Sequence, residues 1–418
     1  MASTSIKDVH APSEPMGKSV HDPASRTPKS TALPSGRRLY VRLFLGGFCW
    51  TFLQLALGIH NLEFSAGYET VSVAQGLAKT GNFANPYMTP TGPTAHVAPV
   101  YPLLMAIPFR VLNRVTAGLV ITTLNAAFLG LEMCLLAMLS TRLFGAARPG
   151  VFGAILLAAS TQLIPQHDAV LSAVLLLAAV ISLLWESPMR AGVWAGISAL
   201  TNPVSALAIA VVSLLRGWRF VAITGTLAIS ICLPWSLRNW KELGAPSFVR
   251  DNFGLELALS NYDDADPQLI VNPGLWKLHP SRNPTEAQSM ATLGEAAYYR
   301  EKLHTGVEWI KTHPGQFVRL SALRTYYYWF PPLREGWPAG LHRILLLLAL
   351  AGLWLLRKHR QILALMASAA AYSLPYALVQ TDVRYSVPTL WVLALLSGLS
   401  IHVLISRLAP SKRPLPAQ

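Results

Sequence analysis

The sequence predicts an all-α protein that spans a membrane about ten times. Apolar runs of about 17–23 residues recur along its 418 residues, and this length matches the roughly 30 Å of hydrocarbon that a helix must cross. Only 13% of the residues are charged, against roughly 25% in soluble domains. Because lipid offers no hydrogen-bond partner to a polar backbone, these runs must be helical.

Ten runs have the composition of a membrane-spanning helix. They are residues 39–59, 117–140, 149–164, 169–185, 191–201, 203–215, 219–235, 339–356, 361–379 and 386–406. The fifth and sixth runs are short and are separated by Thr201-Asn202-Pro203. Proline lacks a backbone donor and disfavours helix in the residue before it, so we expect a break between two short helices there.

The loops between these runs separate into a basic set and a nearly neutral set. Basic residues gather at Arg37-Arg38, Arg142 with Arg148, Arg190, Arg216 with Arg219, Arg357-Lys358-His359-Arg360 and Arg407 with Lys412-Arg413. The positive-inside rule places these loops in the cytoplasm, and it accounts for the net charge of +14 without nucleic acid as a partner. The opposite loops then face the exterior.

The remaining segments complete the predicted domain organisation. The N-terminal tail is rich in Ser, Pro, Lys and Arg and lacks apolar periodicity, so we expect it to be disordered and to precede an uncleaved first span. The predicted domains are a disordered cytoplasmic tail at 1–36, an N-terminal transmembrane module at 37–235 that includes the first outer loop at 60–116, an extracytoplasmic segment at 236–338 that forms a helical cap, C-terminal spans at 339–408 and a cytoplasmic tail at 409–418.

Three features that often carry chemistry are expected to be structural here. All three cysteines lie inside apolar runs and are expected to be small core residues. Asp264-Ala265-Asp266 has the spacing of a metal-binding D-x-D, but no Rossmann-like sheet accompanies it. Glu132 lies about 24 Å below the outer face, at 1.5 Å per residue, which is too deep for surface chemistry. We expect a structural partner for it inside the bundle.

Motifs in the outer loops follow one another in a characteristic order. The first outer loop carries Gly67-Tyr68-Glu69, Ala74 to Phe83, and Pro93-Thr94-Ala95 to Tyr101-Pro102. Later motifs are Gln166-His167-Asp168-Ala169, Leu200-Thr201-Asn202-Pro203, Pro234-Trp235-Ser236-Leu237-Arg238-Asn239, Arg250 to Glu256, Trp309 to Pro314, and Arg384-Tyr385-Ser386-Val387-Pro388. Together they resemble GT-C membrane glycosyltransferases, in the bacterial branch related to protein O-mannosyltransferases and aminoarabinose transferases (glycosyltransferase family 39-like). The resemblance covers residues 40–406.

The resemblance implies a catalytic role for Glu69. The family carries an acidic residue in the first outer loop, which serves as catalytic base or positions the acceptor, and a carboxylate at a membrane face suits general-base chemistry. Glu63 lies in the same loop and competes for this role. The family often has Asp, frequently followed by a second acid, whereas Thr70 follows Glu69 here. Val97 stands where some relatives have a lysine that contacts the lipid phosphate.

Asp168 matches the second acidic position of the family. A carboxylate at the start of a helix also suits the helix dipole, so a plain helix cap is the alternative. His96 and Tyr101 are candidates for contacts to the acceptor.

Four arginines are candidates for binding the leaving phosphate, because a guanidinium stays charged and offers a planar fork of donors. Arg384 is the first candidate, Arg238 and Arg250 come next, and Arg324 is fourth. The alternative for each is an interfacial arginine that extends to water.

The function implied is an inverting glycosyltransferase at the outer, periplasmic face of a bacterial inner membrane. It would move a sugar from a polyprenyl-phosphate donor to an acceptor protein, lipid or glycan. A transporter or flippase of a lipid-linked glycan is the first alternative, and a non-catalytic scaffold with the same fold is the second. A divalent metal ion is left open, because Glu69 and Asp168 alone are a thin ligand set.

Overall fold

A computed structural model describes residues 36–58, 64, 68–164 and 166–408. The two predicted tails (apart from Gly36) and the competing carboxylate Glu63 lie outside the described residues. Internal contacts divide the chain into residues 1–39 and 40–418. The architecture below is that of the second part.

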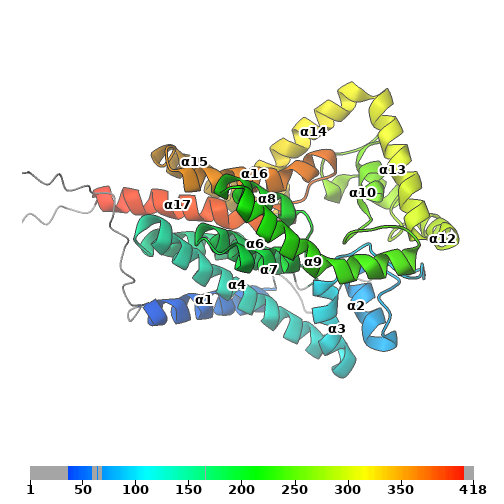
Figure 1. Ribbon diagram of the computed structural model, residues 1–418, viewed down its shortest axis with the longest axis horizontal. Coiled ribbons are helices and arrows are strands. Elements are labelled where there is room, and N and C mark those ends of the chain that lie inside the picture. The colour runs from blue at the N-terminus through cyan, green and yellow to red at the C-terminus, as the bar shows by residue number, and fades with distance from the viewer. Residues whose placement is uncertain (1–35, 59–63, 65–67, 165, 409–418) are drawn as a thin grey trace, which may run out of the picture. The chain divides into compact units, whose positions relative to one another are not determined.

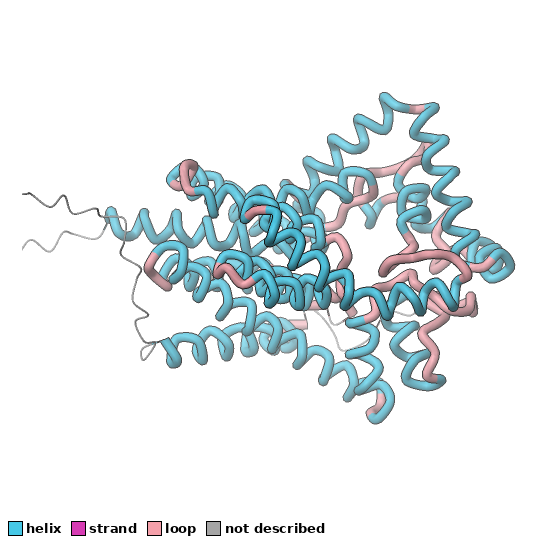
Figure 2. Tube along the Cα trace, in the orientation of Figure 1, coloured by secondary structure: helices cyan, strands magenta, loops and turns pink. Residues whose placement is uncertain are grey.

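The described secondary structure is helical throughout, apart from two isolated backbone bridges, which confirms the predicted fold class (Figure 2). Ten helices lie at the ten predicted spans. They are α1 (Gly36–Ala56), α4 (Arg114–Phe144), α5 (Arg148–Ser160), α6 (Ala169–Leu184), α7 (Pro188–Ala199), α8 (Ser205–Arg216), α9 (Trp218–Leu243), α15 (Trp337–Leu355), α16 (Arg360–Leu378) and α17 (Val387–Leu408).

Six of these ten helices are long and apolar enough to cross a membrane, namely α1, α4, α9, α15, α16 and α17. The other four have 12, 13 or 16 residues. At 1.5 Å per residue they reach about 18–24 Å, so none of them crosses 30 Å of hydrocarbon alone. The bundle is therefore built from long helices together with short ones.

The predicted break between the fifth and sixth spans is present between α7 and α8. Asn202 lies in it, and its side-chain oxygen accepts the Val204 amide at 3.2 Å. Its side-chain nitrogen donates to the hydroxyl of Tyr372 on α16 at 3.0 Å. The break thus brings a polar amide to the interior face of the bundle.

The helix of the seventh predicted span is longer than the span. The apolar run ends near residue 235, whereas α9 continues through Pro234 to Leu243. It ends where Gly244 takes a left-handed conformation with φ +67°, which a glycine adopts without strain. Arg238 therefore lies on a rigid helix instead of in a loop.

The core of the bundle depends on close backbone approach between α5 and α17. A Cβ atom added at Gly153 would lie 2.5 Å from the carbonyl oxygen of Ala394, and one added at Gly398 would collide with the carbonyl oxygen of Pro149. Small residues let membrane helices approach closely enough to gain dispersion contacts. Both helices also pack against α15, and α17 contacts α6.

The remaining helices gather at the end of the bundle where α9 ends (Figure 1). They comprise α2 (Glu69–Thr80) and α3 (Val100–Val111) from the first outer loop, and α10 (Phe253–Ser260), α11 (Gly274–Lys277), α12 (Pro284–Leu293), α13 (Glu295–Thr312) and α14 (Pro314–Trp329) from the later segment. Short 3-10 helices are η1 (Leu269–Val271), η2 (Leu333–Glu335) and η3 (Val383–Ser386). These elements surround the site described next.

The features expected to be structural have different outcomes. Of the three cysteines only Cys232 is buried, and Cys49 is exposed instead of lying in the core. Asp264 is exposed and forms a surface ion pair with Lys277 at 3.1 Å. Glu132 is fully buried in α4, and neither of its carboxylate oxygens has a hydrogen-bond partner among the described residues. The structure therefore does not name the partner that the sequence left open.

Candidate functional site

A cavity of about 560 Å³ lies where the helices α2, α3, α10 and α11 meet the bundle, and we call it the main cavity. Its lining includes six of the site residues that the sequence predicts, namely Glu69, His96, Tyr101, Asp168, Arg250 and Arg384. These residues come from four separate parts of the chain. Tertiary packing therefore brings together most of the groups that were chosen from separate motifs.

Glu69 is the first residue of α2, which buries Val71, Val73 and Ala74. This packing fixes the start of the helix, so that the carboxylate lies at its positive end and faces the cavity. The side chain is 18% exposed. Burial raises the pKa of Glu69, while the guanidinium groups of Arg384 and Arg250 oppose that increase. A carboxylate with a raised pKa and nearby cations suits proton transfer.

Arg384 lies in η3, at the start of α17, and its guanidinium faces the cavity from the opposite side. Nη1 donates to Nε2 of His167 at 3.1 Å, and Nη2 donates to the Tyr385 hydroxyl at 3.4 Å. Nε lies 3.9 Å from Oδ1 of Asp382. Burial and the Arg384 charge lower the pKa of His167, so this ring is neutral and can accept.

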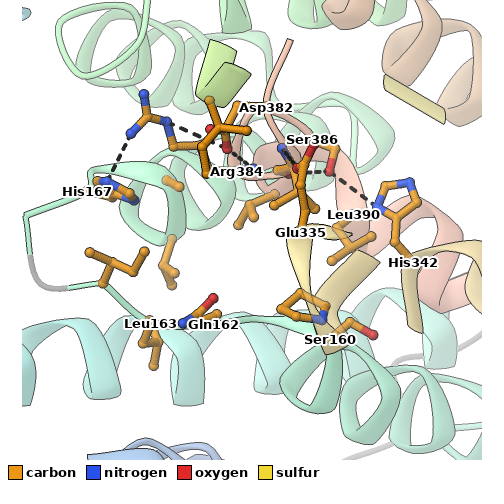
Figure 3. A pocket seen from close by; sticks show the side chains of 17 residues that line it. Ser160, Gln162, Leu163, His167, Glu335, His342, Asp382, Arg384, Ser386 and Leu390 are labelled. Atoms are coloured by element: carbon orange, nitrogen blue, oxygen red, sulfur yellow. Dashed lines mark hydrogen bonds and ion pairs between the residues drawn. The ribbon is translucent and has the colours of Figure 1, made fainter. Parts of the chain in front are cut away.

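A second cavity of about 200 Å³ shares Arg384 and His167 with the main cavity (Figure 3). Most of its other lining residues are apolar, and they include Leu163 in the segment between α5 and α6, Val170 on α6 and Leu390 on α17. Arg384 therefore stands at the boundary between a polar cavity and a largely apolar one.

Asp168 immediately precedes α6, but its side chain makes no capping hydrogen bond. Burial raises the pKa of this carboxyl, and Arg250 and Arg384 oppose the shift. The helix-cap alternative thus has no capping contact to support it, and the carboxyl lines the main cavity.

His96 is 3% exposed, and the hydroxyls of two tyrosines contact its ring. Its Nδ1 lies 3.1 Å from the Tyr87 hydroxyl and 2.7 Å from the Tyr299 hydroxyl. Burial lowers the pKa of His96, with further lowering by Arg250. Arg250 donates from Nε to the His96 carbonyl oxygen at 2.8 Å, so the loop and the guanidinium hold each other in place.

Tyr101, on α3, lines the inner part of the cavity. Its hydroxyl accepts a hydrogen bond from Nδ2 of Asn125 on α4 at 2.7 Å.

Two of the candidate arginines do not line either cavity. Arg238 donates to the carbonyl oxygens of Thr94 and Phe83, both at 2.6 Å, and its guanidinium lies 4.9 Å from the ring centre of Trp235. Arg324 is fully buried and donates to the side chain of Asn261 and to the carbonyl oxygens of Leu378 and Ser260. Both side chains donate to protein carbonyl oxygens and link separate segments of the chain.

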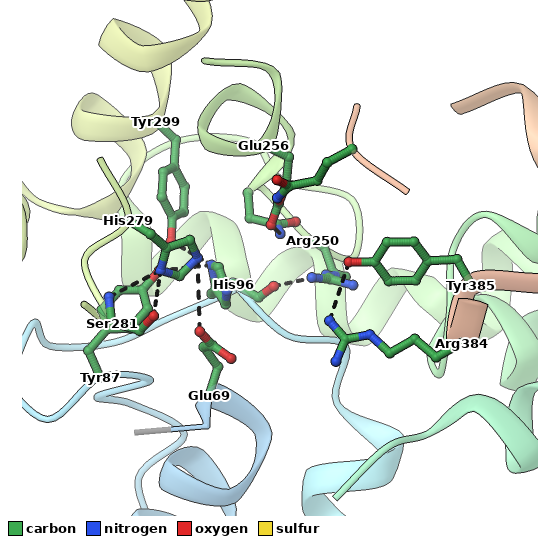
Figure 4. A network of polar contacts seen from close by, with 12 residues as sticks. Glu69, Tyr87, His96, Arg250, Glu256, His279, Ser281, Tyr299, Arg384 and Tyr385 are labelled. Atoms are coloured by element: carbon green, nitrogen blue, oxygen red, sulfur yellow. Dashed lines mark hydrogen bonds and ion pairs between the residues drawn. The ribbon is translucent and has the colours of Figure 1, made fainter. Parts of the chain in front are cut away.

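The main cavity also contains residues that the sequence analysis did not select, chiefly His279, Arg282 and Glu256. His279 Nε2 lies 3.9 Å from Oε1 of Glu69 (Figure 4). The residues around His279 form short turns with no periodicity, so no pattern in the sequence indicates that this ring faces α2. Only the order of histidine and arginine three residues apart, in an outer segment, could have drawn attention to it.

Three ligand-type side chains in the cavity could be considered for a metal ion. Atoms of Glu69, His96 and His279 lie within 4.8 Å of one another. Ligands around a tetrahedral zinc ion lie roughly 3.4 Å apart, given zinc–nitrogen bonds of about 2.0–2.1 Å. The backbone amide of Ser281 donates to Nδ1 of His279 at 3.1 Å, which leaves the proton on Nε2, the atom that faces Glu69. In this arrangement the three side chains do not fit a metal ion.

No family model and no curated protein matches the chain. Among solved structures, ArnT from Cupriavidus metallidurans bound to undecaprenyl phosphate is 14% identical, with 90% of this chain and 79% of that chain covered and a TM-score of 0.35. The same protein in the apo state is also 14% identical, with 87% and 77% covered and a TM-score of 0.36. A likeness this distant transfers no residue roles, which rest on the geometry above.

Proposed function

We propose that the protein is an inverting glycosyltransferase that uses a polyprenyl-phosphate-linked sugar as donor. The observation that carries this proposal is the arrangement of a carboxylate and two guanidinium groups around one cavity, where the outer helices meet a membrane-spanning bundle. Glu69 supplies the carboxylate, and Arg250 and Arg384 supply the positive charge. Such a pairing suits a reaction in which an acceptor loses a proton while a phosphate leaves.

In the proposed reaction, an acceptor hydroxyl or amine attacks the anomeric carbon on the face opposite the phosphate. Glu69 takes the acceptor proton as the new bond forms. The bond between the anomeric carbon and the phosphate oxygen breaks, and its electron pair goes to the phosphate. Arg384 and Arg250 stabilise this developing charge, an effect that reaches several kcal/mol in well-formed sites. Attack from the opposite face inverts the anomeric configuration.

The raised pKa of Glu69 supports its role as a base, because a base works best when its pKa approaches the ambient pH. The neighbouring arginines lower this pKa and so favour the ionised form. Asp168 lines the same cavity and is proposed to orient the acceptor, together with His96 and Tyr101. Arg238, which is committed to carbonyl oxygens, is not part of this proposal.

The proposed location is the inner membrane of a bacterium, with the cavity on the periplasmic side. The basic loops mark the cytoplasmic side under the positive-inside rule, and the cavity lies at the opposite ends of the helices. The donor would reach the cavity from the bilayer. The acceptor class is protein, lipid or glycan.

The test is sugar transfer by the purified protein in lipid nanodiscs with a synthetic polyprenyl-phosphate sugar. We expect wild-type protein to release polyprenyl phosphate, and Glu69→Gln to reduce release at least 100-fold with an unchanged unfolding temperature. Asp264→Asn, which changes an exposed carboxylate of the same kind, is the matched control and should keep wild-type turnover. Full turnover by Glu69→Gln would refute the assigned role.

The same assay separates the alternative functions. A flippase moves the intact donor across vesicle membranes and releases no polyprenyl phosphate. A scaffold does neither. Either result would replace the transferase proposal.

A further inference from the structure

His279 is a buried ring in the main cavity to which the proposed reaction gives no role so far. It lies between α11 and α12, is 5% exposed, and its Nε2 atom lies 3.9 Å from Oε1 of Glu69. Figure 4 shows the ring above the Glu69 carboxylate, with Ser281 on its other side. The ring therefore bridges the cap and the start of α2.

The hydrogen bonds of the ring define which nitrogen carries its proton. Nδ1 of His279 lies 3.1 Å from the amide nitrogen of Ser281 and 2.7 Å from the Ser281 hydroxyl. A backbone N–H can only donate, so Nδ1 must offer its lone pair, and the proton of a neutral ring is on Nε2. Burial lowers the pKa of His279 to about 4, so the ring is neutral near pH 7.

We infer that His279 is a positioning residue that presents its Nε2–H to the Glu69 carboxylate, and that this pair works without a metal ion. The inference rests on the proposed function for the role of Glu69 as base. The present 3.9 Å separation is longer than a hydrogen bond, and a movement of about 1 Å by the Glu69 side chain closes it. The donor then directs one carboxylate oxygen and leaves the other for the acceptor.

The same tautomer opposes metal binding at this place. A histidine binds a metal through a lone pair, so Nε2 would have to lose its proton to Nδ1. Nδ1–H would then face the Ser281 amide, which is also a donor, at 3.1 Å, and only the Ser281 hydroxyl at 2.7 Å could accept from it. Without His279 the group offers only Glu69 and His96, which is too few ligands for a stable divalent site.

Other charged groups around the pair set its electrostatic background. Arg384 and Arg250 lower the pKa of Glu69. Glu256 raises the pKa of His279, and Arg282 lowers it. The rings of His96 and Tyr87 lie 6.0 and 5.7 Å from that of His279. Because His279 is neutral, it contributes a hydrogen-bond donor and no charge, and its removal should raise the pKa of Glu69.

The kinetic test compares His279→Phe with His279→Gln. We expect His279→Phe to lower kcat about tenfold, to leave the donor KM within twofold, and to move the pH–rate midpoint upward. His279→Gln keeps an N–H donor at a similar reach and should restore most of kcat and the wild-type midpoint. A His279→Phe profile that superimposes on the wild-type profile would refute the inference. A rescue failure with a wild-type unfolding temperature would also refute it.

Two measurements do not depend on turnover. In histidine ¹⁵N spectra, the signals lost in His279→Gln should belong to a neutral ring protonated at Nε2. A zinc titration should show no stoichiometric site that is lost in both His279→Gln and Glu69→Gln. A ring protonated at Nδ1, or one equivalent of zinc that both substitutions remove, would refute the inference. If wild-type protein transfers no sugar, the proposed function fails, whereas these spectra still decide the tautomer and the metal.

Discussion

Arginine and carboxylate side chains occur in two neighbouring regions of this protein and are used differently in each. In the main cavity, Arg384 has one neutral histidine and one phenol as hydrogen-bond partners and an aspartate at 3.9 Å. Arg324 lines neither cavity and is fully buried, with acceptors on Asn261, Leu378 and Ser260. Three protein oxygens thus take up Nη1 and Nη2 of Arg324, whose Nε has no partner among the described residues, while Arg384 faces a cavity that can admit a ligand.

The carboxylates show the same contrast. Glu295 lines neither cavity. Its carboxylate accepts the Thr94 hydroxyl and the Ala95 amide, both at 2.5 Å, and faces Asp251. Glu69 faces the cavity with 18% of its side chain exposed. We infer that Glu295 fixes the loop that carries His96, whereas the carboxylate of Glu69 can contact a ligand in the main cavity.

The largest effect is expected when the cavity guanidinium is removed. Arg384→Gln should reduce sugar transfer about 10²–10³-fold, because a donor aimed at developing charge contributes about 2.7–4 kcal/mol. The unfolding temperature should change little, since none of its hydrogen-bond partners is a backbone carbonyl. Parallel measurements of initial rate and thermal unfolding in detergent test this. A destabilisation as large as the loss of rate would erase the distinction between the two regions.

Removal of the buried guanidinium of Arg324 should lower the stability of the fold and leave the activity of the folded protein nearly unchanged. Arg324→Met removes the donor from the side-chain oxygen of Asn261 and from the Ser260 carbonyl, while the Leu378 carbonyl keeps a hydrogen bond from Asn261. Unpaired buried groups cost about 1–3 kcal/mol each. We expect a loss of about 3 kcal/mol or more in stability, with the activity per folded molecule nearly unchanged. Thermal unfolding combined with an activity titration of the folded fraction tests this. Wild-type stability in Arg324→Met would contradict the structural role.

The smallest effect concerns the pH dependence of stability. Burial raises the pKa of Glu295 well above its ordinary range, and it raises that of Asp251 to about 6. Since both folded-state values exceed the unfolded ones, this pair stabilises the fold at low pH, and the contribution is lost as pH rises through 6 and above. In Glu295→Gln the side chain is an amide, which does not titrate in this pH range.

Glu295→Gln should therefore flatten the fall of the unfolding temperature between pH 5 and pH 8 by a few degrees. Glu301→Gln, at an exposed position on the same helix, is the matched control and should leave the profile unchanged. Identical pH profiles for Glu295→Gln and wild-type protein would show that the pair does not share a proton.

The helical architecture was accessible from the sequence because membrane physics determines it locally. Apolar length and proline position are enough to locate ten helices and the break at Asn202. The end of α9 was not accessible, since the apolar run ends near residue 235 while the helix continues to Leu243. That difference matters for function, because it places Arg238 on a rigid helix that points it at the carbonyls of Thr94 and Phe83.

The site was partly accessible for a related reason. Glu69 and Arg384 could be chosen by charge at the outer ends of helices, and both line the cavity. The sequence does not distinguish Arg250 from Arg324. They differ in the hydrogen-bond acceptors that tertiary packing brings to each guanidinium. His279 was missed because its importance comes from a contact with α2, which precedes it by about 200 residues in the chain.

The most direct test of the account combines donor binding with single turnover on the same samples of wild-type and Glu69→Gln protein. We predict equal affinity for the synthetic polyprenyl-phosphate sugar, with product of inverted configuration formed by the wild-type protein alone. Turnover by Glu69→Gln at the wild-type rate, or product that retains the configuration, would contradict the account.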